Sequence, residues 1–382
     1  MKTAVHFGAG KIGRGFIADL LHDSGYKIVF ADVVQPLVDL VNETHEYSLF
    51  LIDHDYEVID QVEAYSTITQ EDKVIKEIAK AEVLTTSVMA TNLPKVAPTI
   101  TKGLKARVEA SNDKKLVVMA CENAIMGTDI LKKAMIETGI MTEEEMDKVA
   151  VFPNTAVDRM VFDGHHHGKD GIEVGDAFEL PVEKNKLEDP ESEPVKGAEY
   201  VDDLAKFLQR KIYMVNCAHA VTSYFGFVKG YSTVQEGLAD TQVLEDVKKT
   251  VMESASALEK IYGFAHEDLV EYMNSMIIQR FTTPGVSDPI ARVAREPIRK
   301  ISANDRIMGP AIQCEELGLD NSYLLKGAAC AMFYKNEEDA QAVELQNYIK
   351  ENGPEAAVVK YIGLKPEDRM TKVIVEEYNK LV

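Results

Sequence analysis

Three polar residues that could carry acid–base chemistry lie within a hydrophobic stretch, RKIYMVNCAHAV, at residues 210–221. Lys211, Asn216 and His219 are each costly to bury unless they find partners. A lysine whose pKa is lowered by desolvation can accept a proton and return it. An asparagine can donate a hydrogen bond to a developing alkoxide, and a histidine can hold the reacting oxygen. Together, the three residue types suit the oxidation of an alcohol to a carbonyl group.

The spacing of these residues predicts that they share one face of a helix. If residues 210–228 form an α-helix, successive side chains are rotated by about 100° around the helix axis. Asn216 then lies roughly 140° and His219 roughly 80° from Lys211, so that the histidine lies between the other two. For any single residue, a structural role in the core or at the surface is the favoured interpretation. The set of three, beside the dinucleotide-binding segment described next, favours catalysis.

The N-terminal segment predicts a strand, a glycine-rich turn and a helix. The turn, GAGKIG at residues 8–13, follows a short buried strand at 3–7 and precedes an amphipathic helix. Gly8 permits the tight turn, Gly10 lets the backbone approach a pyrophosphate, and Gly13 lets the helix pack against the strand. A glycine-rich turn without a ligand is the alternative interpretation.

The residues around this turn specify the dinucleotide. Free N–H groups at the helix start, including those of Lys11 and Ile12, are expected to bind the pyrophosphate. The next predicted strand, residues 27–31, ends at Asp32. A carboxylate there can accept the ribose hydroxyls and would repel a 2′-phosphate. The sequence therefore predicts NAD as the cofactor, in preference to NADP.

Further strand-like segments occur at residues 82–88, 116–123 and 148–154, with helical stretches between them. This alternation predicts a parallel, doubly wound sheet, in which ligands bind beyond the carboxyl ends of the strands. Residues at those ends are expected to line the nicotinamide side, although strand-end capping would explain them as well. They are Thr86, Ser87, Val88, Glu122 and Asn123.

The alternating pattern weakens after about residue 155, and the chain becomes largely helical from about residue 195. The predicted fold class is α/β, with an N-terminal Rossmann-type domain at residues 1–194 and a mainly α-helical domain at residues 195–382. A cleft between the two domains is the expected substrate site.

Composition and charge exclude several classes of protein. The 382 residues are 46% hydrophobic and 27% charged, which is typical of a soluble globular protein. Neither a membrane-spanning run nor a signal peptide is evident, and the four cysteines lie in apolar settings, so a cytoplasmic, zinc-free protein is expected. A net charge of −21 argues against nucleic-acid binding. An anionic substrate would need a local cluster of basic residues.

A run of three histidines, His165, His166 and His167, raises the possibility of a metal site. Consecutive side chains point in different directions in most backbones, so three neighbours rarely share one ion. We expect an exposed loop here, with metal binding as the less favoured interpretation.

The chain resembles a known family. K-x-x-x-x-N-x-x-H is the signature of the polyol-specific long-chain dehydrogenases, and Lys211, Asn216 and His219 match it. Over essentially its whole length, the chain also resembles one branch of this family, which acts on a phosphorylated polyol. The resemblance implies metal-independent interconversion of D-mannitol 1-phosphate and D-fructose 6-phosphate with NAD(H). The segments that carry it are GAGKIGRGF, CEN at 121–123, NTAVDRM at 154–160 and RKISANDRIMGPA at 299–311.

The resemblance also implies roles for individual residues. By the family's pattern Lys211 is the general acid/base, and Asn123 and Asn216 contact the reacting oxygen. His219 and Asp158 support the substrate. The triple histidine departs from the family's pattern, and the resemblance implies no role for it.

The segment RVAREPIRKISANDR, residues 292–306, has a net charge of +3 within a strongly acidic chain. Arginine suits bidentate phosphate contacts, and Arg295 and Arg299 would share a face if the segment were helical. A solvated basic stretch paired with the acidic surface is the alternative. The residues expected to hold a phosphate are Arg295, Arg299, Lys300 and Arg306.

Two other functions fit parts of the sequence. A related dehydrogenase could act on a free polyol or a hexonate instead of a phosphorylated polyol. A non-catalytic NAD-sensing protein would keep the glycine-rich turn and Asp32 but would have no reason to keep Lys211, Asn216 and His219 together. A monomer and a small homo-oligomer fit the sequence equally well.

Overall fold

The computed structural model describes residues 2–51 and 56–382. Contacts divide the chain into two compact units, Met1–Phe207 and Leu208–Val382. The sequence placed the boundary earlier, after residue 194. In the structure, strand β12 (Glu199–Val201) pairs with β11 (Pro181–Glu183), and this pairing keeps the connecting segment in the first unit.

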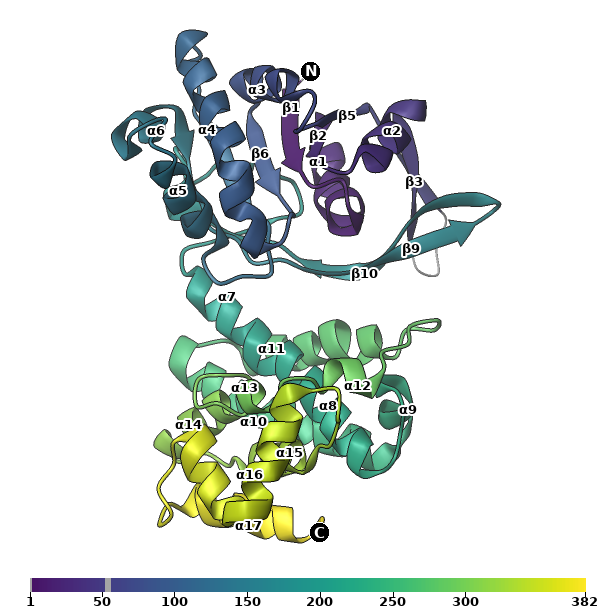
Figure 1. The fold of residues 1–382 in the computed structure, drawn as a ribbon, viewed down its shortest axis with the longest axis vertical. Coiled ribbons are helices and arrows are strands. Elements are labelled where there is room, and N and C mark those ends of the chain that lie inside the picture. The colour runs from purple at the N-terminus through teal and green to yellow at the C-terminus, as the bar shows by residue number, and fades with distance from the viewer. Residues whose placement is uncertain (1, 52–55) are drawn as a thin grey trace. The chain divides into compact units, whose positions relative to one another are not determined.

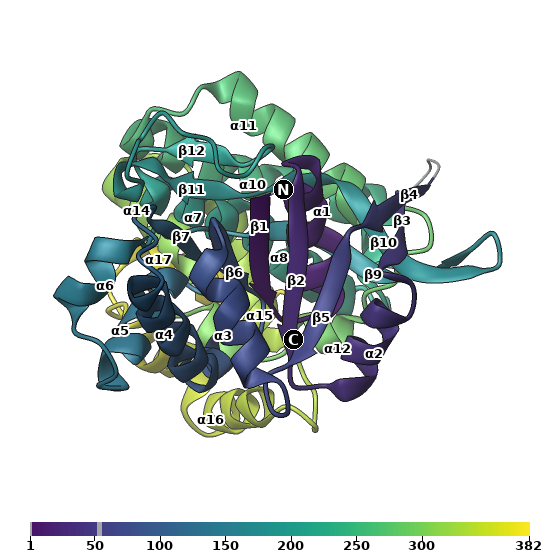
Figure 2. The same ribbon diagram turned by 90° about the horizontal axis from the view of Figure 1, so that it is seen from above.

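The first unit is built on a parallel sheet in the order β5-β2-β1-β6-β7-β8. Four of these strands, β1, β2, β5 and β6, are labelled in Figures 1 and 2. This order is that of a doubly wound dinucleotide-binding sheet, so the predicted Rossmann-type fold is confirmed. The strands are β1 (Lys2–Phe7), β2 (Tyr26–Asp32), β5 (Val62–Ser66), β6 (Val83–Thr86), β7 (Leu116–Ala120) and β8 (Ala150–Val151).

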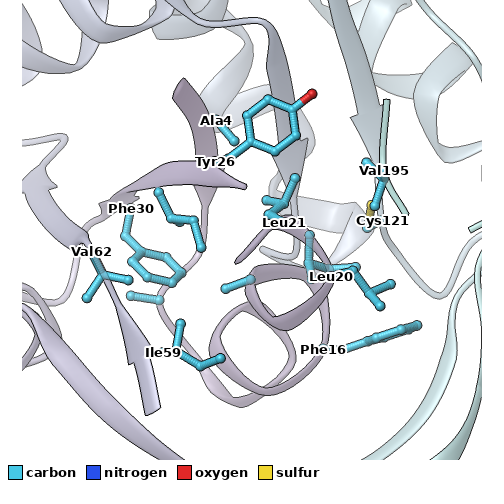
Figure 3. Close-up of a cluster of buried hydrophobic side chains, with 14 of the residues drawn as sticks. Ala4, Phe16, Leu20, Leu21, Tyr26, Phe30, Ile59, Val62, Cys121 and Val195 are labelled. Carbon is cyan, nitrogen blue, oxygen red and sulfur yellow. The ribbon is translucent and has the colours of Figure 1, made fainter. Parts of the chain in front are cut away.

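Helices cover both faces of this sheet. The π-helical turn η1 (Gly13–Ile17), α1 (Ala18–Asp23) and α2 (Gln35–Thr44) pack on one face. In that core, Phe16, Leu20 and Leu21 lie with Ala4 and Phe30 of the strands (Figure 3). The other face packs against α3 (Glu71–Lys80), α4 (Leu93–Glu109) and α5 (Gly127–Glu137), and the short elements η2 (Ala90–Asn92) and α6 (Glu143–Val149) complete this part of the unit.

A second, mixed sheet has the order β4-β3-β10-β9. Its strands are β3 (Glu46–Leu51), β4 (Tyr56–Asp60), β9 (Asp158–His166) and β10 (Lys169–Glu179), and the short η3 (Lys184–Lys186) follows β11. The turn of the β9–β10 hairpin has His167 and Gly168 at positive φ. The histidine run, expected as an exposed loop, therefore lies at the end of a strand and in its tight turn.

The second unit is helical, as predicted. Residues 204–228 form one continuous helical segment of α7 (Leu204–Arg210), η4 (Lys211–Asn216) and α8 (Cys217–Val228), and α7 contains the boundary between the units. Buried residues of α8, α10 and α15 form much of the core, including Val221, Val251 and Leu325. The other elements are α9 (Val234–Ala239), α10 (Thr241–Tyr262), α11 (His266–Met273), η5 (Asn274–Gln279), α12 (Ile290–Val293), α13 (Pro297–Lys300), α14 (Met308–Glu316), α15 (Ser322–Phe333), α16 (Ala340–Ala357), η6 (Val358–Ile362) and α17 (Arg369–Asn379).

Among the described residues, every helix is too short or too polar to cross a lipid bilayer.

Candidate active site

The glycine-rich turn has the geometry that its sequence requires. Gly8 has a φ of 104°, and a Cβ added there would lie 2.6 Å from the carbonyl oxygen of Ser87. A Cβ on Gly13 would lie 2.0 Å from the carbonyl oxygen of Gly8. At Gly10, by contrast, an added Cβ meets no atom within 4 Å of the described structure. The chain therefore needs glycine at the first and third positions for packing, while the middle position leaves space open for a ligand.

Asp32 ends β2 beside this turn. Its Oδ2 accepts a hydrogen bond from the Ala9 N–H at 2.6 Å, and its Oδ1 accepts one from the Val34 N–H at 2.8 Å. Lys11 and Ile12, which open the following helix, have exposed side chains, and Lys11 Nζ lies 2.6 Å from Asp163 Oδ2. The backbone thus holds the carboxylate next to the helix start, where N–H groups lack partners within their own helix.

A buried histidine under the turn was missed by the sequence reasoning. His6 is fully buried, with Nδ1 2.7 Å from Thr85 Oγ1 and Nε2 2.7 Å from Ser87 Oγ. Burial lowers the pKa of His6 to about 3. The ring is therefore neutral and joins the end of β6 to the strand that leads into the turn. Its position in β1, two residues before Gly8, was the available signal.

The ends of β6 and β7 are joined by Glu122. Its Oε1 accepts hydrogen bonds from Thr86 Oγ1 at 2.7 Å and from the Val88 N–H at 2.9 Å. Burial raises the pKa of this carboxyl group. The predicted strand-end residues Thr86, Ser87 and Val88 thus lie together at the carboxyl edge of the sheet, held by His6 and Glu122. Asn123 follows Glu122 and is exposed.

Asp158 is the first residue of β9 and is 8% exposed. It lies opposite Glu179 in the register of the hairpin. The next residue, Arg159, is buried and forms an ion pair with Asp19 of α1. This internal pair ties the start of β9 to the first helix of the sheet.

The segment that carries the lysine, the asparagine and the histidine differs from the regular α-helix that the sequence predicted. Lys211–Asn216 is a π-helical turn, closed by a hydrogen bond from the Cys217 N–H to the Ile212 carbonyl oxygen. Because π-helical hydrogen bonds join residues five apart, this turn is wider than an α-helical turn and brings the directions of Lys211 and Asn216 closer together than the roughly 140° of a regular α-helix. A single π turn within a helix is frequent at functional sites.

The three residues differ from their neighbours in burial. Lys211, Asn216 and His219 are partly exposed, whereas the residues Tyr213–Val215, Cys217, Ala218 and Ala220 are buried. Asn216 and His219 are three residues apart at the start of α8 and are therefore neighbours on the helix surface. All three side chains are therefore partly accessible, and the shared face of the set stays a prediction.

His219 has well-defined partners within its unit. Its Nε2 lies 3.1 Å from Asp288 Oδ2, and its ring centroid lies 4.8 Å from that of Phe281. Asp288 also accepts a hydrogen bond from Arg292 through its other oxygen. The hydrogen bond to His219 is the main reason that the pKa of Asp288 is lowered. Sequence reasoning did not single out Asp288, which is distant in the chain and lies in no recognisable motif.

The basic segment is not one helix. It contains two short helices, α12 and α13, and Glu296 between them has a φ of +60°. Pro297 begins α13, and a proline disfavours α-helical geometry in the residue before it. Arg295 and Arg299 therefore do not share a face of one helix.

The side chains of this segment are largely engaged. Arg299 binds Glu296 and Asp305, and Arg306 Nε donates to Asp305 Oδ1 at 2.8 Å. Arg295 is exposed and its Nε lies 3.3 Å from the Arg292 carbonyl oxygen.

Lys300 differs from the arginines of the segment because it is buried. It donates to the Val293 carbonyl oxygen. Burial, with the nearby Arg306 and Arg299, lowers the pKa of Lys300 to about 7. At neutral pH this side chain is therefore only partly charged.

Comparison with known proteins identifies the family. Residues 2–193 match the mannitol dehydrogenase Rossmann domain, and residues 203–382 match the mannitol dehydrogenase C-terminal domain. The chain belongs to the mannitol dehydrogenase family. The mannitol-1-phosphate 5-dehydrogenase of Geobacillus stearothermophilus is 39% identical to it over 382 residues, covering 99% of each chain. That of Oceanobacillus iheyensis is also 39% identical, over 99% of this chain and 98% of its own.

Solved structures share the fold of this family member. A substrate-free D-sorbitol dehydrogenase matches with a TM-score of 0.80 at 16% identity, covering 99% of this chain and 92% of its own. The ternary complex of Pseudomonas fluorescens mannitol 2-dehydrogenase with NAD and D-mannitol matches with a TM-score of 0.69 at 15% identity, covering 100% of this chain and 92% of its own.

Proposed function

We propose that the protein is an NAD-dependent dehydrogenase that interconverts D-mannitol 1-phosphate and D-fructose 6-phosphate. The observation that carries this proposal is the similarity to mannitol-1-phosphate 5-dehydrogenases over nearly the full length of both chains. The polar face formed by Lys211, Asn216 and His219 supports it, because a protein that only sensed the dinucleotide would not need these groups. The partners are thus a phosphorylated polyol and its ketose, and the protein acts as a monomer or a small homo-oligomer.

The first unit fits the dinucleotide. The open space at Gly10, the helix that begins at Lys11 and Ile12, and the carboxylate of Asp32 match a pyrophosphate and a ribose diol. Thr86, Ser87 and Val88 would line the nicotinamide side. When bound, NAD⁺ supplies the acceptor for the hydride that leaves the carbinol carbon.

The second unit supplies the proton chemistry. In the oxidation direction, the neutral amine of Lys211 takes the proton of the substrate hydroxyl as the carbonyl group forms, and in reduction the ammonium returns it. Asn216 donates a hydrogen bond to the oxygen on which negative charge develops. As the family's pattern implies, Asn123 also contacts the reacting oxygen, and His219 and Asp158 support the substrate.

We propose that the basic segment binds the phosphate group. Arg295, Arg299 and Arg306 supply guanidinium groups there, and Asp305 binds Arg299 and Arg306. An incoming phosphate would compete with this carboxylate for donors that are already oriented. Lys300 contributes charge only in the fraction of molecules in which it is protonated.

The test is NADH oxidation by the purified protein after EDTA treatment, with fructose 6-phosphate, fructose and fructuronate in parallel. We expect a strong preference for fructose 6-phosphate. A preference for fructose or fructuronate would assign a free polyol or a hexonate as the product of reduction and remove the phosphate role of the basic segment. Binding of NADH without turnover of any of the three would favour a dinucleotide sensor, and light scattering of the same sample would give the oligomeric state.

A further inference from the structure

The imidazole of His219 is held on two sides within the second unit. Asp288 Oδ2 lies 3.1 Å from its Nε2, and the ring of Phe281 lies against it with centroids 4.8 Å apart and planes tilted by 33°. Within the described residues, Nδ1 of His219 makes no hydrogen bond. Within the described residues, Nε2 of the ring is therefore hydrogen-bonded to the protein and Nδ1 is not.

The carboxylate that binds His219 is itself fixed by the backbone around it. The Val234 N–H donates to the Asp288 carbonyl oxygen at 2.9 Å, and the Ile290 N–H donates to the Ser232 carbonyl oxygen at 2.9 Å. Residues on both sides of Asp288 are thus joined to the segment that leads into α9. This pairing leaves the Asp288 side chain little freedom to move away from the ring.

Gln235 connects the two groups that hold the imidazole. Its Oε1 accepts a hydrogen bond from the Asp288 N–H at 2.9 Å, and its Nε2 donates one to the Phe281 carbonyl oxygen at 3.0 Å. One amide side chain therefore links the two main-chain segments that carry the carboxylate and the aromatic ring.

This arrangement determines which nitrogen of His219 carries the proton. An ionised carboxylate can only accept hydrogen bonds, so the neutral imidazole must place its N–H on Nε2. Nδ1 then carries a lone pair. The guanidinium of Arg292, bound to the second oxygen of Asp288, favours the ionised carboxylate.

We propose that Asp288 is a positioning residue, which holds His219 in the Nε2–H tautomer so that Nδ1 accepts a hydrogen bond from a hydroxyl group of the polyol. Gln235 supports this role by holding Asp288 and Phe281 in place. The inference rests on the proposed function, because it assigns His219 to the substrate. It adds the residue and the tautomer that make His219 an acceptor.

The first experiment compares Asp288→Asn with the wild-type protein by ¹⁵N NMR of labelled histidines. An asparagine can donate an N–H to Nε2, so we expect the proton of His219 to move to Nδ1. The matched control is Glu259→Gln, which alters another histidine–carboxylate pair of the same unit, with His266 Nδ1 2.7 Å from Glu259 Oε1. An unchanged tautomer of His219 in Asp288→Asn would overturn the proposal.

The second readout is kinetic. We expect Asp288→Asn to lower kcat/KM for fructose 6-phosphate by about 10–100-fold, by analogy with the cost of removing a carboxylate that orients a metal-bound histidine. The Kd for NADH should stay constant, and Glu259→Gln should change neither value. A kcat/KM equal to that of the wild-type protein, with the tautomer changed, would show that the tautomer does not matter and would also overturn the proposal.

Two further arms keep the test decisive. If Asp288→Asn does not fold, Gln235→Met keeps the carboxylate but removes its support, and a mixture of His219 tautomers is expected; a single Nε2–H tautomer would contradict the proposal. If the wild-type protein turns over no sugar, the proposed function fails by itself. The NMR comparison then still decides whether Asp288 controls His219.

Discussion

The two units hold their polar groups in different ways. In the first unit, His6, Glu122 and Asp32 are bound to backbone N–H groups and hydroxyls at the ends of parallel strands. In the second unit, Lys211 and His219 are partly exposed on a helix, and the partners of His219 come from a segment distant in the chain. The polar groups of the first unit are therefore fixed mainly by the sheet in which they lie, and His219 of the second unit is fixed by side chains distant in the sequence. Substitutions in the first should alter cofactor binding and stability, and substitutions in the second should alter turnover.

Lys211→Ala is expected to have the largest effect. Removal of the amine that we propose takes and returns the substrate proton should lower kcat by about 10²–10⁴-fold. Fluorescence titration should find the Kd for NADH nearly unchanged, because the lysine lies in the second unit. Lys229→Ala, at the end of the same helical segment, is the matched control and should keep normal turnover. Normal turnover by Lys211→Ala would remove the lysine from the mechanism.

Arg306→Gln tests whether the second unit recognises the phosphate. A hydrogen bond between charged groups contributes about 1.5–3 kcal/mol, so the KM for fructose 6-phosphate should rise by about tenfold or more. The low turnover of unphosphorylated fructose should change little, and this selectivity is the decisive measurement. Arg369→Gln removes another arginine that is paired with a carboxylate, that of Glu315, and serves as the control. An equal loss with both sugars would point to a structural role for Arg306.

The difference between the units also explains how much could be predicted from the sequence. Gly8 and Gly13 were recognised because any larger residue would collide with the backbone, so the local geometry restricts the residue type directly. Asp32 was predicted to accept the ribose hydroxyls because it ends the second strand. The strands β3, β4 and β5 were missed, since they are short and partly exposed and lack the continuous apolar run of the central strands.

In the helical unit, the residue types were informative and the geometry was not. Nothing in KIYMVN indicates five-residue hydrogen bonding, because a π turn depends on how the surrounding helices pack. The partner of His219 could not be inferred either, since Asp288 lies 69 positions away and only tertiary folding brings them together. The break at Glu296 was not predicted either, although Pro297 gave a local signal for it.

A smaller effect, mainly on stability, is expected for His6→Gln in the first unit. Loss of the bridge between Thr85 and Ser87 should lower the free energy of unfolding by about 1–3 kcal/mol at pH 8, because buried hydroxyls lose a partner. The KM for NADH should rise more than kcat falls, since Ser87 lies against Gly8. Urea unfolding and steady-state kinetics measure these changes. A fall in kcat alone would contradict the assignment of this network to cofactor binding.

The same substitution should change how stability depends on pH. The pKa of His6 is about 3 in the folded protein and near 6.5 in the unfolded chain, so the unfolded state binds the proton first as the pH falls. The stabilisation is fully present above pH 6.5 and is lost toward pH 3, by up to about 1.4 kcal/mol per pH unit. In His6→Gln this contribution disappears, and the unfolding free energy should change less steeply with pH between pH 4 and 6.5. An unchanged slope would mean that His6 does not stay neutral.

The smallest effect is expected at the β9–β10 hairpin, where the histidine run lies. His165 Nδ1 pairs with Asp170 Oδ1 at 2.6 Å and His166 Nε2 with Glu173 Oε2 at 3.1 Å, and both pairs are largely exposed. Exposed pairs contribute little, so the variant His165→Ser/His166→Ser should lose less than about 1 kcal/mol of unfolding free energy. Its turnover after EDTA treatment should equal that of the wild-type protein. A loss of turnover that zinc restores in the wild type but not in the variant would instead make the hairpin a metal site. The first unit would then also hold a functional group built from side chains, and the contrast between the two units would no longer hold.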